Sequence, residues 1–94
     1  MSQPERIVIH NQEAGRFEFR KDSHLAVLEY HLSGGKITFT HTGVPDALGG
    51  QGIGSLLARA GLDHARNQSL AVVPLCSFIA AYIQKHSEYK NLVK

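Results

Sequence analysis

The stretch Val44–Arg66, "VPDALGGQGIGSLLARAGLDHAR", decides the fold because it joins the end of a strand to a helix through a glycine-rich loop. Four glycines fall within the six residues Gly49–Gly54. Apolar residues then recur at helical spacing: Ile53, Leu56, Leu57 and Ala60. We predict a helix that ends near Asn67. The loop before it is either a cradle for an anion or a flexible connection.

Four strands are predicted before the loop: Ile7–His10, Arg16–Arg20, His24–Leu32 and Lys36–Val44. Gly34–Gly35 is a hairpin signal, since both glycines can take positive φ. With a two-residue turn there, the predicted pairs are Leu32 with Ile37, Tyr30 with Phe39, and Leu28 with His41. This register places His41 on the buried, apolar face of the sheet.

After the first helix, Ser69–Leu75 is an apolar run without alternation, which predicts a strand buried on both faces. A shorter helix from Ser77 to Lys85 follows, with Phe78, Ala81 and Tyr82 expected on one side. The predicted fold class is α+β, a mixed α/β arrangement with an antiparallel meander followed by helix–strand–helix. With 94 residues in total, we expect residues 1–94 to form a single domain.

Composition narrows the possible partners. Ten Lys and Arg against eight Asp and Glu give a net charge of +2, too weak to indicate nucleic-acid binding. Cys76 is the single cysteine, so an internal disulfide or a cysteine-based zinc site within one chain is excluded, and the scattered histidines predict no metal site. No segment resembles a signal peptide or a membrane span, so we expect a cytoplasmic protein without a membrane partner.

The glycine loop fails two phosphate-binding templates and fits a third. The Walker A loop requires Gly-Lys-Ser/Thr, which is missing here. The dinucleotide fingerprint requires a third glycine and an acidic partner, and neither is present. The third template is a strand, a glycine loop and a helix whose bare amides face a pyrophosphate. Four glycines exceed what a capping turn needs and each costs backbone entropy, which favours the anion cradle. Ser55 can add a hydroxyl donor.

A family resemblance emerges from four short motifs taken together: His41-Thr42, "GGQGIG", "VVPLCSF" and "KHSEY". In this order they resemble the acetyl-CoA-binding N-acetyltransferases of the GNAT superfamily, above all its short stand-alone branch. The resemblance implies a minimal GNAT-like fold, acetyl-CoA as cosubstrate and an unidentified amine as acceptor. The implied cofactor-binding residues are Thr42, Gly43, Val44, Gly49, Gly50, Gln51, Gly52, Ile53, Gly54, Ser55, Cys76 and Ser77.

Two departures from the superfamily pattern affect this expectation. Gly49 stands where the superfamily usually has Gln or Arg, so the cradle is expected to rely on its backbone. Only "NQEAG", Asn11–Gly15, separates the first two predicted strands. The helices that shape the acceptor site in full-length members therefore have no room there.

Two residues are candidates for catalysis. Cys76 precedes the second helix, where the helix N-terminus favours a thiolate that could accept the acyl group from the thioester. The alternative is a buried, inert cysteine. His41 could act as a general base, although its place in the predicted register favours a hydrogen-bonded core histidine. For Tyr82 and Tyr89, packing is favoured over a role as phenolic acid.

The predicted function is therefore an N-acetyltransferase that acts by direct attack of the amine or through acyl-Cys76. One alternative is a regulatory module that binds coenzyme A with little turnover, which the missing acceptor helices favour. Another is a small protein-interaction domain whose glycine loop binds nothing.

Overall fold

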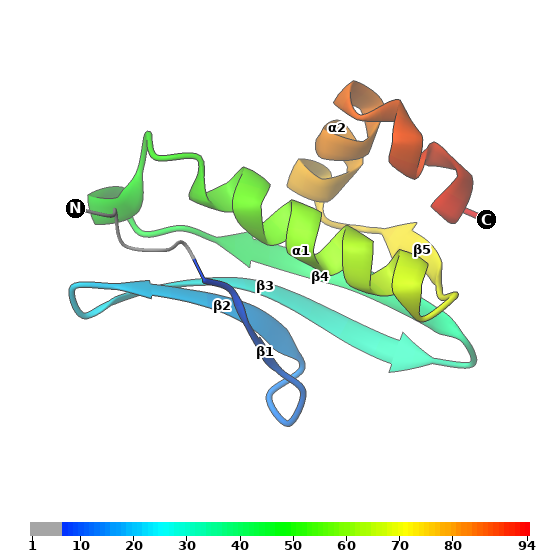
Figure 1. Cartoon of the computed structure of the whole chain (residues 1–94), viewed down its shortest axis with the longest axis horizontal. Coiled ribbons are helices and arrows are strands. Elements are labelled where there is room, and N and C mark those ends of the chain that lie inside the picture. Colours follow the sequence, from blue (N-terminus) through cyan, green and yellow to red (C-terminus); the bar gives the residue numbers. More distant parts are fainter. Residues whose placement is uncertain (1–6) are drawn as a thin grey trace.

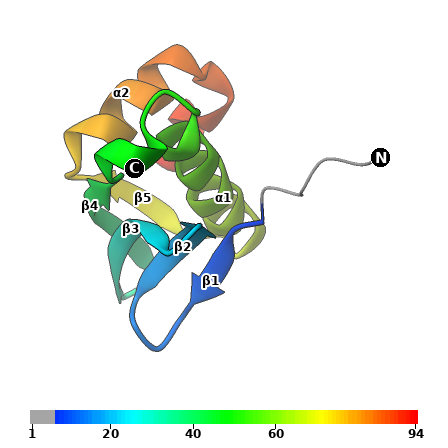
Figure 2. The same ribbon diagram turned by 90° about the vertical axis from the view of Figure 1, so that its left-hand side faces the viewer.

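The computed structural model describes residues 7–94, in which two helices lie on one face of a five-stranded sheet (Figures 1 and 2). The strands are β1 (Ile9–Asn11), β2 (Arg16–Lys21), β3 (His24–Ser33), β4 (Lys36–Gly43) and β5 (Ala71–Pro74). The helices are α1 (Ile53–Asn67) and α2 (Ser77–Lys85), with 3-10 turns η1 (Asp46–Leu48) and η2 (Ser87–Leu92). The predicted order of elements and the α+β fold class are confirmed.

The sheet has the strand order β1-β2-β3-β4-β5, with antiparallel pairing from β1 to β4. β5 returns through α1 to pair in parallel with β4. The predicted end of the first helix, near Asn67, and the predicted bounds of the second helix agree with the structure, while seven of the ten strand ends differ by one or two residues. The first strand begins at Ile9 rather than Ile7, and the last one is confined to Ala71–Pro74.

One feature of the predicted register is wrong. Tyr30 pairs with Phe39 as expected, but the next pair is Glu29 with His41, so Thr40 is an extra residue that forms a β-bulge. Leu28 consequently pairs with Thr42. Because side chains alternate between faces, one extra residue transfers His41 to the opposite face, where it is exposed.

α1 lies close to the sheet because it carries Gly61 at the point of contact. A Cβ on Gly61 would lie 2.8 Å from Leu28 Cδ2 and 2.9 Å from Phe39 Cε1, so only glycine fits there. Leu28 and Phe39 are themselves fully buried. This contact fixes the height of α1 above β3 and β4.

Burial departs from expectation in three places. On α2 the buried residues are Ile79, Tyr82 and Ile83, so the predicted side with Phe78 and Ala81 is wrong by about one position. In β5 only Val72 is fully buried, because no helix within residues 7–94 covers the other face of the sheet. Leu32 is exposed at the end of its hairpin. Among residues 7–94, no helix is both long and apolar enough to cross a bilayer.

Candidate functional site

The two parallel strands, β4 and the edge strand β5, diverge partway along β4. Pairing between β4 and β5 runs from Lys36 with Ala71 to Phe39 with Pro74, and the last link is the Cys76 amide, which donates to the Phe39 carbonyl at 2.9 Å. Beyond Phe39, no described strand pairs with this edge of β4. The Thr42–Val44 backbone therefore lies on an edge that an extended ligand could join as an added strand.

The glycine loop lies directly after this open edge and is anchored by η1. Leu48 is almost completely buried, and the Gly49 amide donates to the Asp46 carbonyl at 2.9 Å. Gly50 has φ of 75° and Gly52 has φ of 73°, which L-residues rarely adopt. These two glycines let the loop turn sharply into α1.

Gly52 is the N-cap of α1, and no side chain caps this helix end. Its first turn contains no acidic residue, so no carboxylate of that turn competes for the free amides. The unsatisfied amides and the helix dipole favour an anion here. Ile53, one of the predicted cofactor-binding residues, has its side chain buried in the core, so only its backbone amide is available to a ligand.

A cavity of about 400 Å³ lies over the loop, within the size range of small-molecule sites. Its lining comes from the end of β4, the loop, the start of α1 and one aromatic ring of α2: Thr42, Val44, Leu48, Gly50, Gly54 and Phe78. Ser55 also lines it and is exposed. A Cβ on Gly54 would lie 2.9 Å from Phe78 Cζ, so the absence of a side chain at Gly54 leaves room for the ring.

Cys76 lies at the N-cap of α2, with its side chain half-buried. Its Sγ is 3.2 Å from Thr42 Oγ1, which the bulge has turned to the helix-covered face. Burial alone would raise the pKa of the Cys76 thiol, but the Thr42 hydroxyl and the amides of Ile79 and Phe78 outweigh it and lower that pKa. The structure thus places a thiol with a lowered pKa at the point where β4 and β5 diverge.

His41 lies on the other face of the sheet from Cys76. A Cβ on Gly43 would lie 3.1 Å from His41 Nε2, so the imidazole lies over Gly43 on the uncovered face. The core-histidine interpretation is therefore wrong. The two catalytic candidates, Cys76 and His41, flank the divergence of the strands from opposite sides.

Two predicted cofactor-binding residues remain, Ser77 and Gln51. Ser77 is the first residue of α2 and is exposed. Gln51 lies between the two positive-φ glycines, and its Oε1 accepts a hydrogen bond from Lys21 Nζ at 3.1 Å. Sequence reasoning missed Lys21, because it lies thirty positions away in the chain.

The two candidate tyrosines belong to a packing cluster at the C-terminal end of the molecule. Tyr89 donates to Asp63 Oδ1 at 2.6 Å, and the Arg66 guanidinium lies 4.8 Å above its ring centre. Burial and the Asp63 carboxylate raise the pKa of Tyr89 to about 12. Tyr82 is buried and stacks on His86. Neither tyrosine lines the cavity over the glycine loop.

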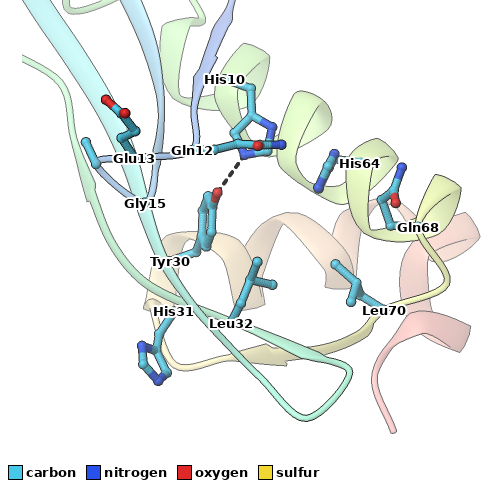
Figure 3. A pocket seen from close by; sticks show the side chains of 11 residues that line it. His10, Gln12, Glu13, Gly15, Tyr30, His31, Leu32, His64, Gln68 and Leu70 are labelled. Carbon is cyan, nitrogen blue, oxygen red and sulfur yellow. Dashed lines mark hydrogen bonds between the residues drawn. The ribbon is translucent and has the colours of Figure 1, made fainter.

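A second cavity, of about 570 Å³, lies beside the C-terminal half of α1 (Figure 3). His10 and Tyr30 meet there through a 2.6 Å hydrogen bond, and His64 of α1 lies edge-on to His10, with 4.5 Å between ring centres. Within residues 7–94, no three His, Cys, Asp or Glu side chains are grouped as metal ligands. This cavity shares no lining residue with the one over the glycine loop.

Residues 16–92 match the family of GCN5-related N-acetyltransferases, and the chain belongs to this family. Its fold is that of the family as well. A GCN5-like protein from Staphylococcus aureus, solved by NMR, superposes with a TM-score of 0.74 at 30% identity, covering 95% of this chain and 88% of that one.

Vertebrate proteins are also similar in sequence to this chain. Protein NATD1 of Mus musculus is 34% identical over 82 residues, which cover 84% of this chain and 74% of the mouse protein. Protein NATD1 of Gallus gallus is also 34% identical, with the same coverage. The chain thus contains a small GNAT-like domain.

Proposed function

We propose that this protein binds acetyl-CoA and transfers the acetyl group to an amine. The observation that carries the proposal is the meeting of three features at one end of β4: an unpaired strand edge, an uncapped helix N-terminus behind positive-φ glycines, and an ionisable thiol. Family membership supports the same reaction class.

Each feature matches one part of acetyl-CoA. The amides of Gly49–Ser55 would hold the pyrophosphate, and the Thr42–Val44 backbone would pair with the amides of the pantetheine arm. Cys76 lies where that arm would end, because its amide makes the last link between β5 and β4. In this arrangement the loop would hold the pyrophosphate through its backbone, without a side-chain donor at Gly49.

Two routes to the product differ in which face of the sheet they use. In the covalent route, the Cys76 thiolate attacks the thioester carbonyl and the coenzyme A thiolate leaves. The acceptor amine then attacks acyl-Cys76, the Cys76 thiolate leaves, and the amine proton passes to that thiolate. In the direct route, the amine attacks the thioester carbonyl, the coenzyme A thiolate leaves, and His41 on the uncovered face would take the amine proton.

Two measurements separate these routes. If the covalent route operates, intact-mass analysis after incubation with acetyl-CoA will show one acetyl group on the wild-type protein and none on Cys76→Ala. Transfer to a panel of amines should then fall at least a hundredfold in Cys76→Ala but only modestly in His41→Gln. An unchanged transfer rate in Cys76→Ala would eliminate the covalent route.

A second function is favoured by one observation. No described helix covers the face of the sheet that carries His41, so the acceptor side of the site is open. This arrangement suits a module that binds acetyl-CoA with little turnover. Tight binding without transfer to any amine in the panel would favour this alternative.

A further inference from the structure

The cavity over the glycine loop lacks a positive charge of its own. Among the described residues that line it, none is Lys or Arg, and Asp46 contributes a carboxylate. A pyrophosphate placed there would carry its negative charges beside that carboxylate. A cation from outside the lining would therefore improve binding.

The turn between β2 and β3 supplies such a cation. β2 ends at Lys21, which pairs with His24 across a two-residue turn at Asp22 and Ser23. Both turn residues have positive φ, 55° and 73°, a conformation that costs energy for residues other than glycine. The turn lies at the same end of the sheet as the glycine loop (Figure 1).

Alternation along β2 directs Lys21 toward the loop. Phe17 and Phe19 are buried on the face that the helices cover, and Lys21 has the same parity. Its Nζ donates to Gln51 Oε1 at 3.1 Å. Within residues 7–94, no carboxylate lies within ion-pair distance of Lys21.

We propose that Lys21 is a phosphate-binding residue that supplies the positive charge for the pyrophosphate of the bound nucleotide. This inference rests on the proposed function. Gln51 holds the ammonium group beside the loop until an anion arrives. A phosphate oxygen then replaces the neutral amide oxygen as acceptor, which makes the hydrogen bond charge-assisted and stronger.

Lys21 thereby replaces what the loop lost at Gly49. The family's usual Gln or Arg at that position would reach the pyrophosphate from within the loop, whereas Lys21 reaches it from another strand. The flexible four-carbon stem of lysine allows this movement without a change of the backbone.

The test compares affinities for coenzyme A by isothermal titration calorimetry in wild type, Lys21→Gln, Lys21→Arg and Lys36→Gln. Lys36 is an exposed lysine at the opposite end of the sheet, so Lys36→Gln makes the same change of net charge. We expect Lys21→Gln to bind about tenfold more weakly, Lys21→Arg within about threefold of wild type, and Lys36→Gln like wild type. Raising the salt concentration should reduce the advantage of wild type over Lys21→Gln.

A second ligand locates the charge. Dephospho-coenzyme A lacks the 3′-phosphate and keeps the pyrophosphate, so the loss caused by Lys21→Gln should persist with it. Disappearance of that loss would overturn the assignment to the pyrophosphate.

Three further results would contradict either the role of Lys21 or the proposed function. Equal affinities of wild type and Lys21→Gln would overturn this inference while leaving the proposed function intact. Equal losses in Lys21→Gln and Lys36→Gln would also overturn it, because net charge alone would then be the cause. Failure of the wild-type protein to bind coenzyme A would overturn the proposed function itself.

Discussion

At Gly54, the missing side chain lets the Phe78 ring lie against the first turn of α1. The nearest ring atom is Cζ, 2.9 Å from where a Cβ would be. Phe78 is 40% exposed, so its ring is only partly covered by the rest of the protein. The pair connects the start of α1 to the start of α2 and forms one wall of the cavity over the glycine loop.

This contact predicts coupling between the two residues. Gly54 has helical neighbours, so alanine there would by itself stabilise the protein by up to about 1 kcal/mol. In wild type the new methyl group must displace the Phe78 ring, which offsets that gain. In a Phe78→Ala background the ring is absent, and Gly54→Ala should stabilise the protein.

Urea unfolding of the four proteins of this cycle measures the effect. We expect an interaction free energy of about 1 kcal/mol between the two substitutions. Additivity within about 0.5 kcal/mol would show that the ring does not depend on the glycine.

At the same scale, the sequence predicted Cys76 correctly as the residue before α2 but not its partner. The order of strand and helix fixes the thiol at a helix N-terminus. Thr42 became its hydrogen-bond partner only because of the bulge at Thr40. Periodicity contains no signal for one extra residue in a strand whose neighbours are all β-formers.

Among the secondary-structure elements, both helices could be predicted from the sequence, but the face on which each strand residue lies could be predicted only in part. The helical spacing of apolar residues determines α1 from local sequence alone, and Gly34–Gly35 likewise determine the turn between β3 and β4. Register beyond the bulge depends on pairing with β3, and a shift of one residue moved His41 from the buried face to the exposed one.

The packing of β1 depends on pH through His10. It has only three residues and is held through His10, whose ring stacks on Phe17 at 4.1 Å between centres. Burial, with a further contribution from His64, lowers the pKa of His10 below its ordinary value of 6.5. The folded state therefore favours neutral His10.

The sign of the pH dependence follows from this shift. Well above pH 6.5, His10 is neutral in both the folded and the unfolded state and its contribution to stability is complete. As pH falls through 6.5 the unfolded chain binds the proton first, and stability decreases. Urea unfolding at pH 7.5 and pH 5.5 should show a smaller free energy of unfolding at the lower pH.

Two variants show whether His10 is responsible. His10→Phe keeps an aromatic ring beside Phe17 and should reduce the difference between the two pH values. His31→Gln removes an exposed histidine whose ring points away from this cluster (Figure 3), so it should retain the wild-type difference. An equal pH difference in wild type and His10→Phe would contradict the role of His10.

At the scale of the whole molecule, the fold gathers residues from distant parts of the chain at one end of the sheet. The β2–β3 turn lies beside the glycine loop there, and the start of α1 in turn contacts Phe78 at the start of α2. The strand–loop–helix part of this site was predictable because its residues are contiguous. Lys21 was not, since its contact with Gln51 depends on the complete β2–β3–β4 arrangement.

The central claim is that the glycine loop binds acetyl-CoA, and calorimetric titration with acetyl-CoA tests it most directly in wild type, Gly50→Ala and Gly34→Ala. Both glycines have positive φ with no atom within 4 Å of an added Cβ, so each substitution costs about 1–2 kcal/mol of backbone strain. Only Gly50 lines the cavity.

We predict one acetyl-CoA per wild-type chain, an affinity at least tenfold weaker in Gly50→Ala, and wild-type affinity in Gly34→Ala. Absence of binding to wild type, or equal losses in the two variants, would contradict the claim.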